Sequence, residues 1–331
     1  MIKKLKLTNF RNFTKKEFEF GEGITVINAP NAKGKTNILE AIFMLSTGKS
    51  FKARREEESI NYDCDLARIK GDSLEIVLTK DIPEWPKKKL LVNGIARRMI
   101  DFAGNLKTTL FLPEDLDLVT STPTLRRRFL DTVLSQVDRE YRRAIGSYEK
   151  GVRQRNRILL RIREENISRS NLLFWNQLLI KNGNYITERR REFIEFINSL
   201  NKCNLKYDSS AISEGRLEQY KNEEIASAMT LVGPHRDDFI FLKNDRDLAS
   251  YGSRGEQRME ILWLKLAELA FVEAKTGELP TLLLDDIFSE LDHEHRKIVL
   301  DSIGNHQVII TSADEHNLPK IKSEELKIIN L

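Results

Sequence analysis

The chain has 331 residues, of which 31% are charged and 40% hydrophobic, a composition typical of a globular protein with about two domains. No apolar run approaches the roughly 18 residues of a membrane span, and no apolar segment follows the basic start. We therefore expect a cytoplasmic protein without signal peptide or membrane anchor, and we interpret Cys64 and Cys203, which lack metal-ligand spacing, as reduced thiols.

The net charge of +4 is distributed unevenly. Residues 126–163 contain twelve Lys or Arg and four acids, a net charge of +8 that leaves −4 for the rest of the chain. A basic segment on a mildly acidic body indicates a polyanion partner such as DNA, and the alternative is an ordinary solvated helix face. The predicted DNA contacts are Arg126, Arg127, Arg128, Arg142 and Arg143.

A strand, a loop and a helix follow one another near the start of the chain. Strands are predicted at residues 2–9 and 16–20, and glycines then turn the chain into a buried strand at residues 24–27. The sequence A-P-N-A-K-G-K-T-N comes next, and apolar residues recur at helical spacing over residues 38–45.

This loop fits the phosphate-binding (P-loop) pattern G-x-x-x-x-G-K-[ST], apart from its first position. In that pattern backbone amides cradle phosphates, the lysine reaches the β and γ oxygens, and the hydroxyl residue holds Mg²⁺. Gly34, Lys35 and Thr36 take these roles, whereas Ala29 replaces the first glycine and Pro30 contributes no amide. The alternative is a chance G-K-T at a helix start. The predicted nucleotide contacts here are Ala29, Pro30, Asn31, Ala32, Lys33, Gly34, Lys35, Thr36 and Asn37.

The middle of the chain changes from strands to helices. Residues 74–79 and 109–112 are predicted strands, and Asn93-Gly94 is a strong hairpin signal between residues 90–92 and Ile95. Pro113 ends the last of these strands. Pro123 opens a helical region that runs to about residue 165, and a second long helix is predicted at residues 170–198. Its apolar stripe, assigned to the core, comprises Leu172, Leu173, Trp175, Leu178, Leu179, Ile186, Phe193 and Ile197.

Strands and helices alternate again towards the end of the chain. The expected elements are strands at residues 239–242, 279–287, 307–310 and 327–329, and helices at residues 256–275 and 292–303. Such alternation implies a parallel sheet flanked by helices. We predict an α/β fold with a mixed sheet, antiparallel N-terminal strands and a helical-hairpin lobe at residues 123–229 that is inserted between residues 1–122 and 230–331.

Two acids end the buried strand L-L-L-D-D, at the sheet edge where ligands bind in open α/β sheets. We expect Asp285 to hold the Mg²⁺ water shell opposite Thr36, and Asp286 to orient or deprotonate the attacking water. The alternative is that both acids merely cap the following turn.

The stretch Y-G-S-R-G-E-Q-R at residues 251–258 precedes that strand. Ser253 and Glu256 fit a capping box, which is a purely structural reason for these two residues. The box does not require Gly255, Gln257 or Arg258. A helix N-terminus with a glycine offers amides and a positive dipole end to an anion, such as a nucleotide held between two subunits.

Together these motifs resemble the ABC-type ATPases of the SMC class: the phosphate loop, the S-x-G-E-Q signature, the L-L-L-D-D strand and S-E-L-D at residues 289–292. Three further stretches narrow the resemblance to the RecF family. They are N-A-x-G-K-T-N with L-E-A-I at residues 31–42, P-E-D-L through R-R-R-F-L-D at residues 113–131, and G-P-H-R-D-D at residues 233–238. The short helical lobe also fits RecF, because SMC relatives carry far longer coiled coils.

The resemblance implies an ABC-type ATPase head that uses ATP and Mg²⁺ and forms an ATP-dependent homodimer. Ser253 and Gly255 would reach the γ-phosphate bound at Lys35 of the other subunit, with Glu256 and Gln257 beside them. Arg11 and Asn12 resemble the family's N-terminal nucleotide contact, residues 113–115 its Q-loop region, Asp292 the loop that senses the partner site, and Thr311 or Ser312 the switch position. The catalytic residues implied are Lys35, Ser253, Asp285 and Asp286.

RecF-like proteins bind double-stranded and gapped DNA, including single/double-strand junctions. They act with RecR and RecO to load RecA, and they support replication restart and SOS induction. The chain departs from the family at Ala29, at residues 120–122, where a lysine-glycine pair is usual, and at residues 50–53. We expect a weak, DNA-stimulated ATPase. The alternatives are a nucleotide-binding scaffold for RecR with negligible turnover, the ATPase module of an overcoming-lysogenisation-type nuclease, and an ABC transporter subunit.

Overall fold

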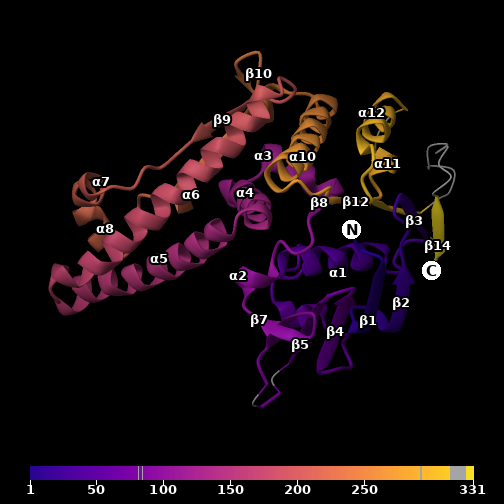
Figure 1. Cartoon of the computed structure of the whole chain (residues 1–331). Coiled ribbons are helices and arrows are strands. Elements are labelled where there is room, and N and C mark those ends of the chain that lie inside the picture. The colour runs from indigo at the N-terminus through magenta and orange to yellow at the C-terminus, as the bar shows by residue number, and fades with distance from the viewer. Residues whose placement is uncertain (81, 84, 291–292, 314–325) are drawn as a thin grey trace. The chain divides into compact units, whose positions relative to one another are not determined.

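The computed structural model describes residues 1–80, 82–83, 85–290, 293–313 and 326–331 (Figure 1). The chain folds into two compact units: unit 1 comprises residues 1–115 and 265–331, and unit 2 comprises residues 116–264. Unit 2 is larger than the lobe of residues 123–229 proposed from the sequence, because it also holds a small sheet and the first part of a long helix. No helix in the described ranges is long and apolar enough to cross a membrane.

The N-terminal strands of unit 1 form an antiparallel sheet, which confirms the predicted antiparallel strands and the predicted hairpin. The Asn93-Gly94 turn joins its last two strands, and Val92 pairs with Ile95 across the turn. In sheet order the strands are β2 (Phe13–Glu19), β1 (Lys4–Phe10), β4 (Leu66–Gly71), β5 (Leu74–Thr79), β6 (Lys88–Val92) and β7 (Ile95–Arg97). The structure adds β4, for which the sequence gives no prediction.

A second sheet in unit 1 is entirely parallel. Its order is β14 (Lys327–Asn330), β3 (Ile24–Asn28), β13 (Val308–Ser312), β12 (Thr281–Asp285) and β8 (Thr108–Phe111). The α/β fold is thus as predicted, with parallel and antiparallel strands in separate sheets. Shorter elements complete the unit: η1 (Glu56–Ser59), α2 (Met99–Phe102), η2 (Pro113–Leu116), α11 (Ile287–Glu290) and α12 (His293–Ile303).

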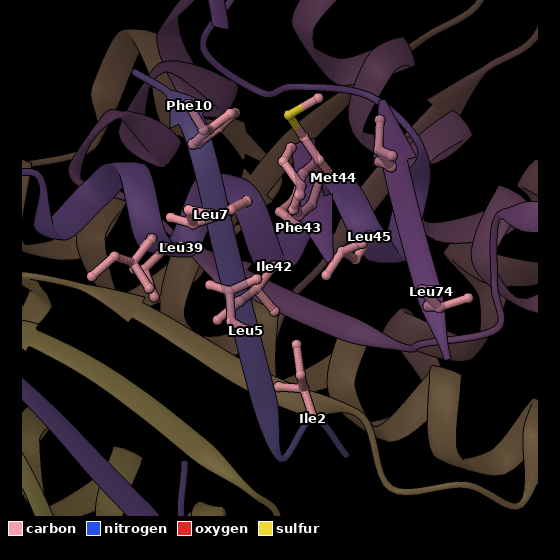
Figure 2. Packing of buried hydrophobic residues seen from close by; sticks show 14 of the residues in the cluster. Ile2, Leu5, Leu7, Phe10, Leu39, Ile42, Phe43, Met44, Leu45 and Leu74 are labelled. Atoms are coloured by element: carbon pink, nitrogen blue, oxygen red, sulfur yellow. The ribbon is translucent and has the colours of Figure 1, made fainter. Parts of the chain in front are cut away.

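Helix α1 (Lys35–Thr47) lies between the two sheets. It contacts β4 and β5 on one side and β8, β12 and β13 on the other. All of residues 38–46 are buried, as expected for a helix that is apolar all round. Figure 2 shows Leu39, Ile42 and Leu45 of this helix in the same core as Leu5 and Leu7 of β1. The start of α1, which carries the phosphate loop's lysine, therefore continues into a helix that is packed into the core of the unit.

Unit 2 is built around a long antiparallel helical hairpin, α5 (Arg139–Glu165) packed on α6 (Leu173–Ser199). The helical region expected from Pro123 to about residue 165 is two helices, because Asp138 interrupts it. The Asp138 side chain accepts hydrogen bonds from the backbone N–H groups of Glu140 and Tyr141 and so caps α5.

Smaller elements surround the hairpin. The helices are α3 (Asp117–Thr120), α4 (Pro123–Val137), η3 (Arg169–Leu172), α7 (Glu214–Gln219), α8 (Lys221–Ser227), η4 (Pro234–Arg236), α9 (Leu248–Tyr251) and the start of α10 (Arg254–Thr276). A three-stranded sheet has the order β11 (Arg246–Asp247), β10 (Asp238–Lys243) and β9 (Leu205–Asp208).

The predicted core stripe of the second long helix is partly wrong. Leu173 is 63% exposed at the start of α6, and Trp175 and Leu178 are only half-buried. Leu179 and the later members of the stripe are buried, and so is Leu172, which packs with Leu159 and Ile162 of α5. The packing partner therefore extends past Leu173, and helical spacing alone does not show which residues of a broad apolar stripe are covered.

Two carboxylates share one ammonium group inside unit 1. The Lys265 Nζ lies 3.2 Å from Glu268 Oε2 and 3.6 Å from Asp115 Oδ2. The side chains of Lys265 and Glu268 are only 6% and 4% exposed. Burial, only partly offset by Lys265, raises the pKa of Glu268 to about 7. The carboxyl of Asp115 has its pKa raised for the same reason.

We predict that Glu268→Gln changes the pH dependence of stability. Because the folded-state pKa of Glu268 is raised, the protonated side chain contributes fully to the free energy of unfolding at low pH. This contribution is lost as the pH rises towards 7 and the carboxyl ionises. The free energy of unfolding of the wild type should therefore fall relative to Glu268→Gln between pH 5 and 8, by up to about 3 kcal/mol. Denaturant unfolding across this range tests the prediction. The control is Glu278→Gln, at a side chain that is 59% exposed. Its free energy of unfolding should differ from that of the wild type by a nearly constant amount across this pH range.

Candidate functional site

The carboxyl ends of the parallel strands gather the predicted site residues at one edge of the sheet. In the strand register Asp285 lies beside Thr311, and Ser312 lies beside Asn28, after which the phosphate loop begins. The chain after β8 reaches this edge at Pro113. Ligands bind at such an edge in open α/β sheets.

The phosphate loop needs its second glycine for a steric reason. Gly34 is the N-cap of α1 and has a φ of 100°, a left-handed conformation that favours glycine. A Cβ added there would lie 2.6 Å from the Asn12 amide and 2.9 Å from the Phe13 ring. The backbone of the loop therefore turns into the helix directly against the β1–β2 hairpin.

The loop tolerates alanine at its first position. Ala29 is buried, its φ is not in the left-handed region, and its N–H donates to the carbonyl of Ser312 at 3.2 Å. Lys35 is also buried, and its ammonium donates to the carbonyl oxygens of Ala29 at 2.6 Å and Pro30 at 3.3 Å. The lysine thus lies along the inside of the loop, where the loop pattern places it.

Three side chains connect the start of α1 to β12 and β13. The Thr36 hydroxyl donates to Asp285 Oδ2 at 2.8 Å, and the Thr311 hydroxyl donates to Asp285 Oδ1 at 2.6 Å. Both carboxylate oxygens of Asp285 are therefore oriented by hydroxyl groups. A threonine hydroxyl beside a carboxylate is a hard oxygen donor set of the kind that Mg²⁺ prefers.

Asp286 has an unusual backbone conformation. Its φ is 49°, in the left-handed region, which is uncommon for a residue other than glycine. Its backbone N–H donates to the Thr311 hydroxyl at 3.0 Å. Such residues cluster at functional sites, where the surrounding structure holds them in place.

The N-terminal hairpin reaches the loop through Asn12. The Asn12 amide donates to the Lys33 carbonyl at 3.0 Å and accepts from the Asn37 amide at 2.9 Å. Arg11 instead forms a bidentate pair with Glu40, at 2.9 and 2.6 Å. Its role as a nucleotide contact stays a prediction.

Glu40 is a residue of this region that sequence reasoning missed. It is completely buried on α1, where Arg11 and Ser50 both donate to it. The signal was available, since an acid in the middle of an apolar helix requires a partner.

The signature residues lie in unit 2 and form the predicted capping box. The N–H of Ser253 donates to Glu256 at 2.8 Å, and the N–H of Glu256 donates to the Ser253 hydroxyl at 3.3 Å. These bonds from Ser253, together with Lys243, lower the pKa of Glu256 to about 2. Gln257 is buried and donates to the Leu248 carbonyl.

Gly255 has no such structural role within the chain. A Cβ added to it would meet nothing within 4 Å, and its φ is not in the left-handed region. The fold therefore explains Ser253, Glu256 and Gln257, but not the glycine between them.

Part of the predicted DNA surface is internal. Arg126 is 6% exposed and donates to both carboxylate oxygens of Asp238, at 2.6 and 2.9 Å. The prediction that Arg126 contacts DNA is therefore wrong, because the side chain is buried. Arg127 is half-buried and donates to the carbonyl of Asp237 at 2.8 Å, and the half-buried Arg142 donates to the carbonyl of Ser135.

Other cations of the basic segment are exposed. Arg128 is exposed, and Arg143 is exposed but pairs with Glu140. Lys150, Arg153 and Arg157 recur at helical spacing along α5, and none has an acidic partner among the described residues. The basic face of α5 is defined here as these three residues.

The G-P-H-R-D-D motif makes its side-chain contacts within unit 2. His235 Nδ1 lies 2.9 Å from the Tyr148 hydroxyl, and its Nε2 lies 2.9 Å from the Thr230 carbonyl. The carbonyl can only accept, so Nε2 carries the proton, and burial lowers the histidine's pKa. Arg190, itself buried, donates to Asp237 at 3.0 Å. The motif therefore anchors the base of the helical hairpin.

One predicted residue lies outside the described part of the chain. Asp292, expected in the loop that senses the partner site, is not described, and neither are the side chains of Ser289 and Glu290.

Comparisons with known proteins agree over nearly the full length. The family described as RecF/RecN/SMC N terminal domain matches residues 1–329. The DNA replication and repair protein RecF of Oceanobacillus iheyensis is 34% identical over 94% of this chain and 93% of its own. That of Halothermothrix orenii is 35% identical over 100% of this chain and 96% of its own.

Solved structures show the same likeness. The recombination mediator protein RecF in the RecFOR pathway, described as RecF-ATPrS, has a TM-score of 0.86 at 31% identity, over 96% of this chain and 94% of that one. The form described as RecF-ATP has a TM-score of 0.85 at 30% identity, over 96% and 93%. An SMC head bound to the C-winged helix domain of ScpA shares the fold alone, with a TM-score of 0.50 at 18% identity, over 99% and 93%.

Proposed function

The chain belongs to the RecF family, and from this premise we propose that it is a DNA-binding ATPase of replication and repair whose nucleotide controls the pairing of two subunits on DNA. The solved RecF relatives are described with ATP and ATPrS, which supports ATP as the ligand of residues 29–37. The proposed cofactors are ATP and Mg²⁺.

The observation that carries the proposal is the pair of hydrogen bonds from Thr36 and Thr311 to Asp285. Thr36 and Asp285 would hold Mg²⁺, which when bound neutralises charge on the β- and γ-phosphates. Lys35 would exchange the carbonyls of Ala29 and Pro30 for phosphate oxygens, because the ammonium gains an attraction to a full negative charge that a neutral carbonyl does not offer.

Asp286 is the proposed group that orients or deprotonates the attacking water. Asp286 follows Asp285, the last residue of β12, and its left-handed backbone turns the chain away from the strand at the sheet edge. The Thr311 hydroxyl connects the two acids, since it donates to Asp285 and accepts from the Asp286 N–H. A rearrangement at Thr311 would therefore affect the metal ligand and the general base together.

The signature supports an ATP-dependent homodimer. Gly255 is unexplained by contacts within the chain, and a glycine in the first turn of α10 leaves its amides open to an anion brought by a second subunit. In this arrangement Ser253 and Gly255 close the partner's nucleotide site.

DNA binding is proposed for the basic face of α5 and for Arg128 rather than for Arg126. Lys150, Arg153 and Arg157 are exposed and unpaired within the described residues, so their charges are available to phosphates. Family membership is the basis for the other proposed partners, which are gapped DNA, RecR and RecO, and for the proposed role in RecA loading.

The alternative function is a scaffold for RecR with negligible ATP turnover. The amide missing at Pro30 favours this alternative. A steady-state ATPase assay with and without duplex DNA distinguishes the two functions.

We predict that Ser253→Arg binds ATP as a monomer but does not dimerise. A bulky cation at the signature obstructs closure on the partner's nucleotide, whereas loss of the cap alone costs only about 1 kcal/mol of stability. Light scattering with ATP measures the dimer. Ser253→Asp is the control, because aspartate also caps a helix but brings negative charge towards phosphate, so it should fold normally and fail to dimerise. A normal dimer in both variants would leave the capping box as the sole role of Ser253.

We predict that replacing Lys150, Arg153 and Arg157 with Glu weakens duplex binding strongly and reduces its salt dependence. Removing one cation that binds a phosphate lowers the slope of log K against log salt by about 0.9. Titrations at several salt concentrations measure this slope. The control carries the same charge change at the exposed Lys181, Arg191 and Lys206 of the same unit. Equal weakening in both variants would show an effect of net charge rather than a binding face.

A further inference from the structure

A buried carboxylate lies in the second turn of the helix that follows the phosphate loop. Glu40 is 0% exposed on α1, and its sequence neighbours Leu39 and Ala41 are buried apolar residues. The Arg11 guanidinium donates to Glu40 through Nε at 2.9 Å and through Nη2 at 2.6 Å. The Ser50 hydroxyl donates to the same carboxylate. Both oxygens of Glu40 therefore have a defined partner inside the protein.

The packing of α1 does not by itself require this ion pair. The side chains of Arg11 and Glu40 are only 16% and 0% exposed, so both charges have lost most of their hydration. Replacing such a buried pair with apolar residues of similar volume is often neutral or stabilising. All of residues 38–46 are buried, and an apolar side chain at position 40 would continue the same packing. The pair is therefore better explained by what Arg11 holds in place than by the stability of α1.

Arg11 lies in a turn of unusual backbone conformation. It is the first of the two residues between β1 and β2, and its φ of 52° is in the left-handed region, which is uncommon for a residue other than glycine. Its N–H donates to the Ser59 carbonyl at 2.9 Å, and its carbonyl accepts from the Asn61 amide at 2.8 Å. The guanidinium also donates to the Glu58 carbonyl at 2.6 Å. Together with the pair to Glu40, these bonds hold a backbone conformation that is unfavourable in isolation.

The second residue of the turn, Asn12, contacts the phosphate loop. Its amide donates to the Lys33 carbonyl at 3.0 Å and accepts from the Asn37 amide at 2.9 Å. In a trans peptide, the carbonyl of one residue and the N–H of the next point in opposite directions. The bond to the Lys33 carbonyl therefore directs the Gly34 N–H away from Asn12. In a phosphate loop, backbone amides of this kind cradle the phosphates.

We propose that Glu40 is a positioning residue for the nucleotide site, which acts through Arg11 and Asn12 to keep the phosphate-loop amides ready for ATP. Glu40 holds the Arg11 side chain, this side chain holds the turn, and the turn places Asn12 on the loop. This role rests on the proposed function, because it takes ATP as the ligand of residues 29–37. It adds to that function a residue that acts on the nucleotide site from the interior of unit 1.

The test is titration calorimetry of the full chain with ATP and Mg²⁺. Glu40→Gln removes the negative charge that holds the guanidinium, and it should weaken ATP binding about tenfold, the scale seen when an outer-shell partner of a binding site is removed. Asn12→Ala should have a similar effect. Because both residues act through one hydrogen-bonded route, the double variant should bind ATP no more weakly than Asn12→Ala alone.

The matched control is Ile42→Ala, at a residue of α1 that is as buried as Glu40 but has no polar side-chain atom. This variant should lower the melting temperature and leave the ATP affinity unchanged, which separates a loss of packing from a loss of position. If Glu40→Gln does not fold, Arg11→Met combined with Glu40→Leu takes its place. That variant should fold, because it leaves no uncompensated charge in the interior, and it should also bind ATP about tenfold more weakly.

Each of three results would overturn this role of Glu40. Unchanged ATP affinity in Glu40→Gln, or in its apolar replacement pair, would leave the ion pair without influence on the nucleotide. Additive losses in the double variant, about a hundredfold together, would show that Glu40 acts by a route other than Asn12. An equal loss of affinity in Ile42→Ala would show that the packing of α1 controls the loop. Absence of ATP binding in the wild type would instead overturn the proposed function itself.

Discussion

The proposed site depends on the carboxylate of Asp285, which accepts a hydrogen bond from one hydroxyl group at each of its oxygens. Thr36 comes from the start of α1 and Thr311 from β13, so a single side chain connects three elements distant in sequence. The parallel register makes this possible, because it places the ends of β3, β12 and β13 at one edge. The core around α1 then fixes the loop relative to that edge. Small errors in this register would separate the metal ligands from the lysine.

Buried charge in unit 2 serves the fold. Arg126 pairs with Asp238 and Arg190 with Asp237, both of them inside the unit. Removing one partner of such a pair is strongly destabilising, because it leaves an uncompensated charge in the interior. The net charge of residues 126–163 therefore includes cations that are buried and cannot contact DNA. What remains accessible is the narrower basic face of α5.

Much of the nucleotide site could be predicted from the sequence, because its residues sit at fixed spacing around strand ends. Lys35, Thr36 and Asp285 are of this kind, and the structure brings them to one sheet edge. Burial of long side chains was less predictable: Arg126 and Arg127 are neighbours, yet helical phase buries the first more than the second. The prediction for Leu173 was wrong for a related reason: its neighbour Leu172 packs with Leu159 and Ile162 of α5, whereas Leu173 is exposed. Glu40 shows by its place in an apolar helix that it needs a partner, but the sequence does not identify that partner as Arg11, 29 residues earlier.

Binding of ATP with Mg²⁺ to Lys35→Ala, measured by titration calorimetry beside the wild type, tests the central claim most directly. Lys35 lies inside the loop and carries the charge that would face the β- and γ-phosphates. We predict that the wild type binds and that the variant shows no measurable heat of binding, while its melting temperature shows that it remains folded. Wild-type affinity in Lys35→Ala would contradict the assignment of residues 29–37 as the nucleotide site.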